Sequence, residues 1–175
     1  MKYKILIVDD EPANLRVLER LFRGQHEVLT ATSGAEALAA LESHDVALLI
    51  ADQRMPEMSG IELVGRTVSL RPHMVRILLT GYTDVSSLIE AINCGHVYKY
   101  VTKPWNNEEL AITVSRALAH YDAVKTRHNL KMVNDRLRAR LNEIAELAVT
   151  GGEVLPESQL NTVVREHHAD VISPN

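Results

Sequence analysis

The sequence predicts an α/β protein in which one parallel sheet of five strands carries helices on both faces. Short runs of apolar and β-branched residues alternate with segments of helical periodicity, and this alternation repeats five times within residues 1–120. Several of the apolar runs stop directly before polar or charged residues, at the strand ends where ligands bind in open α/β sheets. Apolar residues make up 46% of the 175 residues and charged residues 24%, a composition that favours a packed core.

The strands are predicted from five apolar runs. The first covers residues 5–8 and is followed at once by two acids. Continuous runs of this kind are typical of strands that are buried on both faces, as in a parallel sheet. The predicted strands are 5–8, 27–31, 46–51, 74–79 and 97–101.

The helices are predicted from apolar periodicity and from the residues that begin or end them. Pro12 fits the first turn of a helix, and Gly24 ends that helix. Ser33, with Glu36 three residues later, has the pattern of a capping box. The predicted helices begin at about residues 12, 33, 61, 84 and 107; the third runs to about residue 69 and the fourth to about residue 93.

Polar side chains stand at the ends of four of these strands: Asp9 and Asp10, Asp52, Thr80, and Lys103. Taken singly, each of them is a common turn or loop residue. The parallel fold gathers all of them at one edge, where clustered carboxylates repel one another unless a hard cation such as Mg²⁺ lies among them. Lys103 offers a positive charge to a phosphoryl oxygen, and one carboxylate could act as nucleophile. The pattern predicts a site that accepts or holds a phosphoryl group.

Residues 1–120 resemble the receiver domains of two-component response regulators. The segments that carry the resemblance are ILIVDDEPANLRVL, LLIADQRMPEMSGIEL, VRILLTGYTD and YKYVTKPW. Their wording is most similar to receivers of hydrogenase-type transcriptional regulators and of cyclic-nucleotide phosphodiesterase or cyclase regulators. The resemblance implies a doubly wound, flavodoxin-like (βα)5 fold, extended here by a C-terminal helix.

The resemblance also implies a role for each acidic residue. Asp52 is the expected phosphoacceptor, and its phosphoryl group is expected from a sensor histidine kinase or a phosphotransfer protein. Mg²⁺ is the expected cofactor, held by Asp9, Asp10, Asp52 and the backbone carbonyl of Arg54.

The remaining roles concern the response to phosphorylation. The resemblance implies that Thr80 and Lys103 bind the phosphoryl group on Asp52. Tyr100 matches the switch aromatic, which turns inward when Thr80 moves toward the phosphate. The peptide bond before Pro104 is expected to be cis.

An enzyme is the first alternative. Phosphatases of the haloacid-dehalogenase type also use a strand-end aspartate, Mg²⁺, a threonine and a lysine. They need a second acid two residues after the nucleophile, where this chain has Arg54 after Asp52. After Asp9 and Asp10 the chain has Glu11, instead of the usual Asp-x-Asp-x-Thr run of these enzymes. The sequence therefore favours a protein that is not an enzyme.

Binding to nucleic acid or to a membrane is also disfavoured. The net charge of the chain is −4, and residues 121–175 hold seven basic and eight acidic residues. This segment shows neither a helix-turn-helix pattern nor the phosphate-binding loop of an ATPase. Cys94 is the one cysteine, which rules out an intramolecular disulfide. With no signal-peptide pattern and no 18-residue apolar run, the expected location is the cytoplasm.

A single long helix is predicted from residue 107 to the glycine pair that begins at Gly151. From residue 130 its apolar residues follow the 3-4 spacing of a coiled-coil heptad, with Arg140 as the one discordant residue and Leu141 beside it. These apolar residues are Leu130, Val133, Leu137, Ile144 and Leu147. Such a face predicts a homodimer through a coiled coil, or a helix that folds back on its own receiver.

The predicted organisation is a receiver domain at 1–120, a helical extension at 121–150, and a short helix and tail at 151–175. Its expected output is dimerisation, or docking of the helix to a downstream protein. The alternative is that this receiver belongs to a larger regulator, with a transcription-activating or cyclic-nucleotide output that lies beyond this chain.

Overall fold

The computed structural model describes residues 2–81 and 96–151 of the chain. The elements, in order, are β1 (Lys4–Val8), α1 (Pro12–Phe22), β2 (Glu27–Ala31), α2 (Gly34–Ser43), β3 (Leu48–Asp52), α3 (Gly60–Leu70), β4 (Val75–Thr80), β5 (Lys99–Thr102) and α5 (Asn107–Gly151). The helices predicted near residue 84 and within 151–175 lie outside the described residues.

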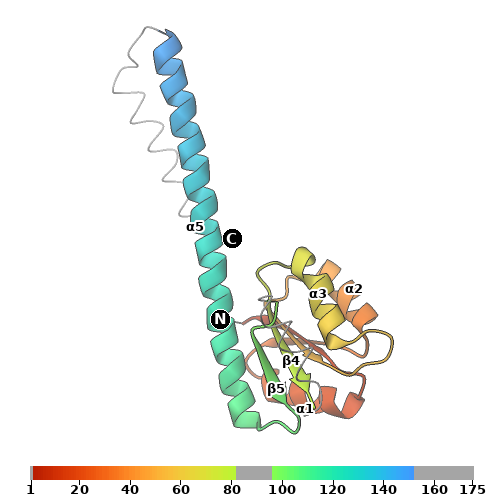
Figure 1. Ribbon diagram of the computed structural model, residues 1–175. Helices are drawn as coiled ribbons and strands as arrows, with labels where there is room; N and C mark the ends of the chain where they lie inside the picture. The colour runs from red at the N-terminus through yellow and green to blue at the C-terminus, as the bar shows by residue number, and fades with distance from the viewer. Residues whose placement is uncertain (1, 82–95, 152–175) are drawn as a thin grey trace. The chain divides into compact units, whose positions relative to one another are not determined.

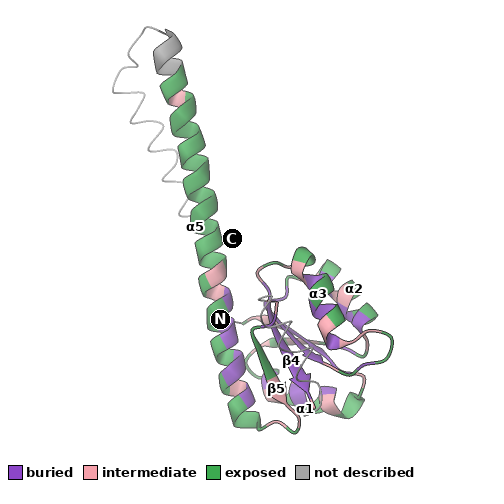
Figure 2. Cartoon of the chain, viewed as in Figure 1, coloured by how far each residue is buried: buried purple, intermediate pink, exposed green. Residues whose placement is uncertain are grey.

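The five strands form one sheet in the order β2-β1-β3-β4-β5, and every neighbouring pair is parallel. This order is that of a doubly wound α/β fold, which confirms the predicted fold class. β3 and β4 lie inside the sheet and are buried along their whole length. β5 lies at the edge of the sheet (Figure 1). It is partly exposed (Figure 2).

Side chains that alternate along the strands build two separate cores, one on each face of the sheet. On one face, Ile7 and Ile50 pack with Leu18 of α1 and with Val114 of α5. On the other face, the side chains that alternate with these along the strands pack against α2 and α3 (Figure 1). The sheet is therefore covered on both sides, which explains why its strands read as continuous apolar runs.

Two strands begin two residues later than predicted, while the other strand boundaries agree to within one residue. β3 begins at Leu48 instead of residue 46, and β5 begins at Lys99 instead of residue 97. Val46 and Val97 are buried although they precede the strands. Apolar residues indicate burial, and buried residues need not be paired in the sheet. The two apolar runs therefore begin before the first paired residue of each strand.

The helix caps also differ from the pattern that the sequence offered. At α2 the Ser33 hydroxyl accepts from the Glu36 amide at 3.2 Å, but the Glu36 carboxylate accepts from Thr32. A complete capping box stands at α3, where the Ser59 side chain accepts from the Glu62 amide and the Glu62 carboxylate accepts from the Ser59 amide. This box fixes the start of α3 next to β3.

The chain forms two compact units, residues 1–127 and 128–175. α5 is 45 residues long, close to the long helix expected, and ends at Gly151. Asn106 caps its start by accepting from the amides of Glu108 and Glu109 at 2.8 and 3.1 Å. In the second unit, α5 residues 128–146 are exposed except for Ile144, which is half-buried (Figure 2).

Candidate functional site

The site lies where three strands end at the carboxyl edge of the sheet. Asp9 follows β1, Asp52 is the last residue of β3, and Lys103 follows β5. Both carboxylates are nearly inaccessible, with 0% of Asp9 and 5% of Asp52 exposed. The sheet order brings these residues from three separate β-α units to one place, as the sequence predicted.

Lys103 joins the two carboxylates. Its Nζ lies 2.6 Å from Asp52 Oδ1 and 2.9 Å from Asp9 Oδ2. Short charge-assisted contacts of this kind are strong when the groups are buried. The side chain of Lys103 is therefore held between the two buried acids.

Backbone amides and one asparagine hold the carboxylates from their other sides. The Glu11 amide donates to Asp9 Oδ1 at 2.9 Å, and the Asn14 amide group donates to both Asp9 oxygens at 3.1 Å. The Arg54 amide donates to Asp52 Oδ2 at 2.9 Å. Asn14 was not identified from the sequence, although its place in the first turn of the helix after Asp9 was a usable signal.

The cluster changes the acidity of its members. Burial raises the pKa of Asp52 above its usual value and the charge of Asp9 adds to this, while Lys103 opposes it. Burial by itself lowers the pKa of Lys103, but the hydrogen bonds and charges of Asp52 and Asp9 outweigh burial and raise it. Lys103 therefore stays protonated. Burial makes the charged form of the Asp52 carboxylate less favourable than it would be in water.

The other predicted site residues follow β1 or belong to β4 and β5. Asp10 is half-buried, and Thr80, at the end of β4, is 3% exposed with its hydroxyl donating to the Gly81 carbonyl at 3.1 Å. Tyr100 in β5 is 43% exposed. The Lys103–Pro104 peptide bond is cis, as expected.

The chemistry of the donors fits a hard divalent cation. Asp9, Asp10, Asp52 and the carbonyl of Arg54 are all oxygen donors, which Mg²⁺ prefers. The buried carboxylates of Asp9 and Asp52 share one cation, Lys103, and are left with one net negative charge that a divalent cation would offset. Within residues 2–81 and 96–151, no group of three or more histidine, cysteine or acidic side chains is already arranged as a metal site.

A doubly wound α/β sheet with a lysine-bridged acid pair at its carboxyl edge is the arrangement expected of a receiver domain. Residues 5–115 match the family model of the response regulator receiver domain, and the chain belongs to that family. Receiver domains act in two-component signalling, where they interact with histidine kinases or phosphotransfer proteins and bind Mg²⁺ at the acidic site.

Curated relatives are larger proteins. The hydrogenase transcriptional regulatory protein HoxA of Bradyrhizobium diazoefficiens is 37% identical over 117 residues, which are 67% of this chain and 24% of HoxA. The transcriptional regulatory protein ZraR of Klebsiella oxytoca is 32% identical over 178 residues, covering 94% of this chain and 40% of ZraR. The chain thus spans about a quarter to two fifths of the length of these relatives.

Solved structures show the same fold. A structure described as adenylate cyclase from Rhodopirellula baltica matches with a TM-score of 0.73 and 32% identity, over 75% of this chain and 98% of that one. The receiver domain of an HD domain-containing protein from Pseudomonas fluorescens matches with a TM-score of 0.67 and 34% identity, over 70% and 99%. The predicted similarity to hydrogenase-regulator and cyclase-regulator receivers is confirmed.

In the described parts of the chain, none of the helices combines the length and the apolar character needed to span a bilayer.

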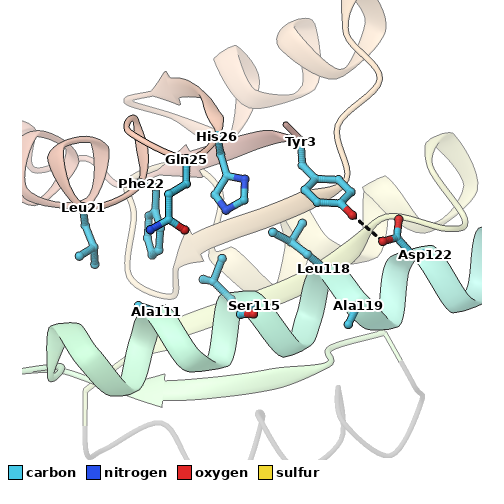
Figure 3. A pocket seen from close by; sticks show the side chains of 11 residues that line it. Tyr3, Leu21, Phe22, Gln25, His26, Ala111, Ser115, Leu118, Ala119 and Asp122 are labelled. Carbon is cyan, nitrogen blue, oxygen red and sulfur yellow. Dashed lines mark hydrogen bonds between the residues drawn. The ribbon is translucent and has the colours of Figure 1, made fainter. Parts of the chain in front are cut away.

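A hollow of about 310 Å³ lies at a different place, between the end of α1, the start of β2 and α5 (Figure 3). The Tyr3 hydroxyl donates to the Asp122 carboxylate at its rim. The His26 side chain faces this hollow, and its Nδ1 atom is buried without a hydrogen-bond partner among the described residues. Burial lowers the pKa of His26 below its usual value.

We expect this histidine to make the fold sensitive to mild acid. A histidine whose folded-state pKa is depressed stabilises the fold fully above the unfolded value of about 6.5 and loses that contribution as pH falls through the folded pKa. His26→Phe keeps a ring beside Tyr3 but cannot take up a proton. Urea unfolding between pH 7.5 and 5 should show the wild type losing more stability than His26→Phe; parallel pH curves would contradict this.

Proposed function

We propose that this receiver accepts a phosphoryl group on Asp52 from a histidine kinase or a phosphotransfer protein. The observation that supports this most is the contact of Lys103 with both Asp52 and Asp9, because it prepares a carboxylate nucleophile beside a fixed positive charge. In this proposal Asp9, Asp10, Asp52 and the carbonyl of Arg54 hold Mg²⁺.

The reaction is a phosphoryl transfer. A carboxylate oxygen of Asp52 forms a bond to phosphorus while the phosphorus–nitrogen bond to the donor histidine breaks, and the electron pair of that bond leaves with the imidazole. Lys103 stabilises the negative charge that develops on the phosphoryl oxygens. Mg²⁺ held by Asp9, Asp10, Asp52 and the Arg54 carbonyl would supply further positive charge to the site.

Thr80 and Tyr100 connect the modification to the surface. In the proposed phosphorylated form, the Thr80 hydroxyl leaves the Gly81 carbonyl and donates to the phosphoryl group. The ring of Tyr100, now 43% exposed, then moves inward into the space that Thr80 gives up. The surface of β5 and the start of α5 changes as a result.

The phosphoryl transfer is tested with acetyl phosphate and Mg²⁺ as the probe. Intact-mass spectrometry of the wild type should show the mass of one added phosphoryl group per chain, and chelation of Mg²⁺ should abolish it. Asp52→Asn should remain unmodified. If Asp52→Asn were modified to the wild-type level, the phosphoacceptor would be a different residue. Continued turnover of acetyl phosphate would instead favour a phosphatase.

We further propose that the α5 extension carries the output through a homodimer. The exposed apolar residues of α5 in the second unit support this. Solution mass measured with and without beryllofluoride and Mg²⁺ tests the switch, and Asp52→Asn should abolish any response. A monomer in both states would contradict the dimer.

A second candidate is that the chain is the receiver part of a larger regulator. The observation that favours it is that the match to ZraR continues past the family model, over 94% of this chain, and still covers only 40% of ZraR. In that case α5 is the connection to an output domain, which in relatives of this kind belongs to transcriptional regulatory proteins.

A further inference from the structure

The carboxylate of Asp9 has its full set of hydrogen-bond donors. Oδ1 accepts from the Glu11 amide at 2.9 Å and from the side-chain amide of Asn14 at 3.1 Å. Oδ2 accepts from the same Asn14 nitrogen at 3.1 Å and from Lys103 Nζ at 2.9 Å. An ionised carboxylate offers about four acceptor positions, two on each oxygen, so these contacts use the capacity of Asp9. The residue is 0% exposed, and bulk water does not reach it.

This set of donors leaves no acceptor position on Asp9 for a cation. In the proposed function Asp9 helps to hold Mg²⁺, a cation that binds oxygen atoms and keeps several of its waters. Asp9 can offer an oxygen to the cation, directly or through a water molecule, only if one of its present donors releases that oxygen. How firmly each donor is held therefore decides which one gives way.

Two of the three donor groups are held firmly. The Glu11 amide belongs to the backbone before α1, and the Glu11 carbonyl accepts from the Asn14 backbone amide at 3.0 Å. Lys103 carries a charge and lies 2.6 Å from Asp52, which keeps its Nζ between the two acids. Contacts between charged groups are also roughly twice as strong as contacts between neutral ones.

The side chain of Asn14 is the donor that is held least firmly. It is uncharged and half-buried, and its one nitrogen is shared between both oxygens of Asp9 at 3.1 Å each. Such a three-centre contact divides one donor group between two acceptors. Rotation about the side-chain bonds of Asn14 releases Asp9 without moving α1, because the backbone of Asn14 keeps its own hydrogen bond to Glu11.

We propose that Asn14 is a positioning residue that competes with the divalent cation for the carboxylate of Asp9. The inference rests on the proposed function and concerns the same site. In the cation-free protein, Asn14 compensates the buried charge of Asp9, and in the cation-bound protein it releases at least one of the two oxygens. The free energy that this contact gives to the cation-free site therefore weakens the binding of Mg²⁺ by the same amount.

Removal of the Asn14 amide should accordingly tighten the binding of Mg²⁺. Asn14→Leu removes the donor but keeps the branching and the number of side-chain heavy atoms, so that water does not replace the amide. Asn14→Ala leaves room for a water molecule, and its effect should have the same direction and be smaller. Asn129→Ala is the matched control, because Asn129 is an exposed asparagine of α5 in the second unit.

Urea unfolding of the full chain at rising Mg²⁺ concentration measures the affinity. Trp105, the one tryptophan of the chain, reports unfolding by fluorescence. The stability gained at each Mg²⁺ concentration, relative to NaCl at equal ionic strength, gives the dissociation constant. Because only the gain is compared, the change in helix propensity at residue 14 cancels. A purely structural role of Asn14 would lower stability equally with and without Mg²⁺.

Asn14→Leu should lower the dissociation constant for Mg²⁺ by about three- to tenfold, the range expected for the net loss of one hydrogen bond. Asn129→Ala should bind Mg²⁺ as the wild type does. An unchanged constant for Asn14→Leu would mean that another donor gives way, and a higher constant would mean that Asn14 helps to hold the cation. Either result would overturn the inference while leaving the proposed cation site intact. If Mg²⁺ stabilised neither the wild type nor the variants, the proposed cation site would fail together with the inference.

Discussion

Gly60→Ala is expected to lower the free energy of unfolding by about 3 kcal/mol, at the upper end for overpacking a rigid site. A methyl group at residue 60 would overlap the backbone carbonyl oxygen of Asp52 and lie 2.9 Å from Leu78 Cδ2. The carbonyl belongs to β3 and cannot move without disturbing the sheet. The Gly60 amide also donates to the Gln53 carbonyl at 3.1 Å, which holds the start of α3 against this strand.

Gly65→Ala is the matched control in the same helix. An added methyl group there has no atom within 4 Å. Because alanine is the better helix former, this change should raise stability by up to about 1 kcal/mol. Urea unfolding of both variants measures the contrast, and equal effects of the two substitutions would show that the close approach at residue 60 is not rigid.

Arg76→Met is expected to cost about 4 kcal/mol, because it removes the partners of several buried carbonyls at 1–3 kcal/mol each. Arg76 is only 5% exposed. Its guanidinium donates to the Thr67 hydroxyl at 2.8 Å, the Thr67 carbonyl at 2.9 Å, the Arg71 carbonyl at 2.7 Å and the Met74 carbonyl at 2.6 Å. Burial lowers the pKa of Arg76 to about 10, which leaves it protonated at neutral pH.

Two other variants separate the hydrogen bonds from the charge. Arg76→Lys keeps a cation but lacks the planar fork that reaches four acceptors, so it should lose most of the same stability. Arg16→Met removes an arginine that is exposed on α1 and should change stability by less than about 0.5 kcal/mol. Chemical denaturation at pH 7 checks all three, and a near-neutral Arg76→Met would show that water can satisfy these carbonyls.

The sequence predicted the alternating fold and the acidic edge because both depend on order along the chain. Asp9, Asp52 and Lys103 follow apolar runs, and a parallel sheet must bring such positions together. Arg76 could not be anticipated, since it interrupts an apolar run, and its partners are the Thr67 hydroxyl and carbonyls of the end of α3 and of the turn before β4, which become acceptors only in the folded structure. The capping box at Ser59 is different, because Ser59 and Glu62 have the same Ser-x-x-Glu spacing in the sequence as Ser33 and Glu36, and this spacing was a usable signal.

The contacts of Lys103 with Asp9 and Asp52 also determine the net charge of this buried cluster. Asp9, Asp52 and Lys103 together carry one net negative charge. In the proposed phosphorylated form, Asp52 carries about two negative charges in place of one. A single divalent cation then brings the cluster to zero, so phosphorylation should tighten the hold on that cation as much as the cation favours phosphorylation.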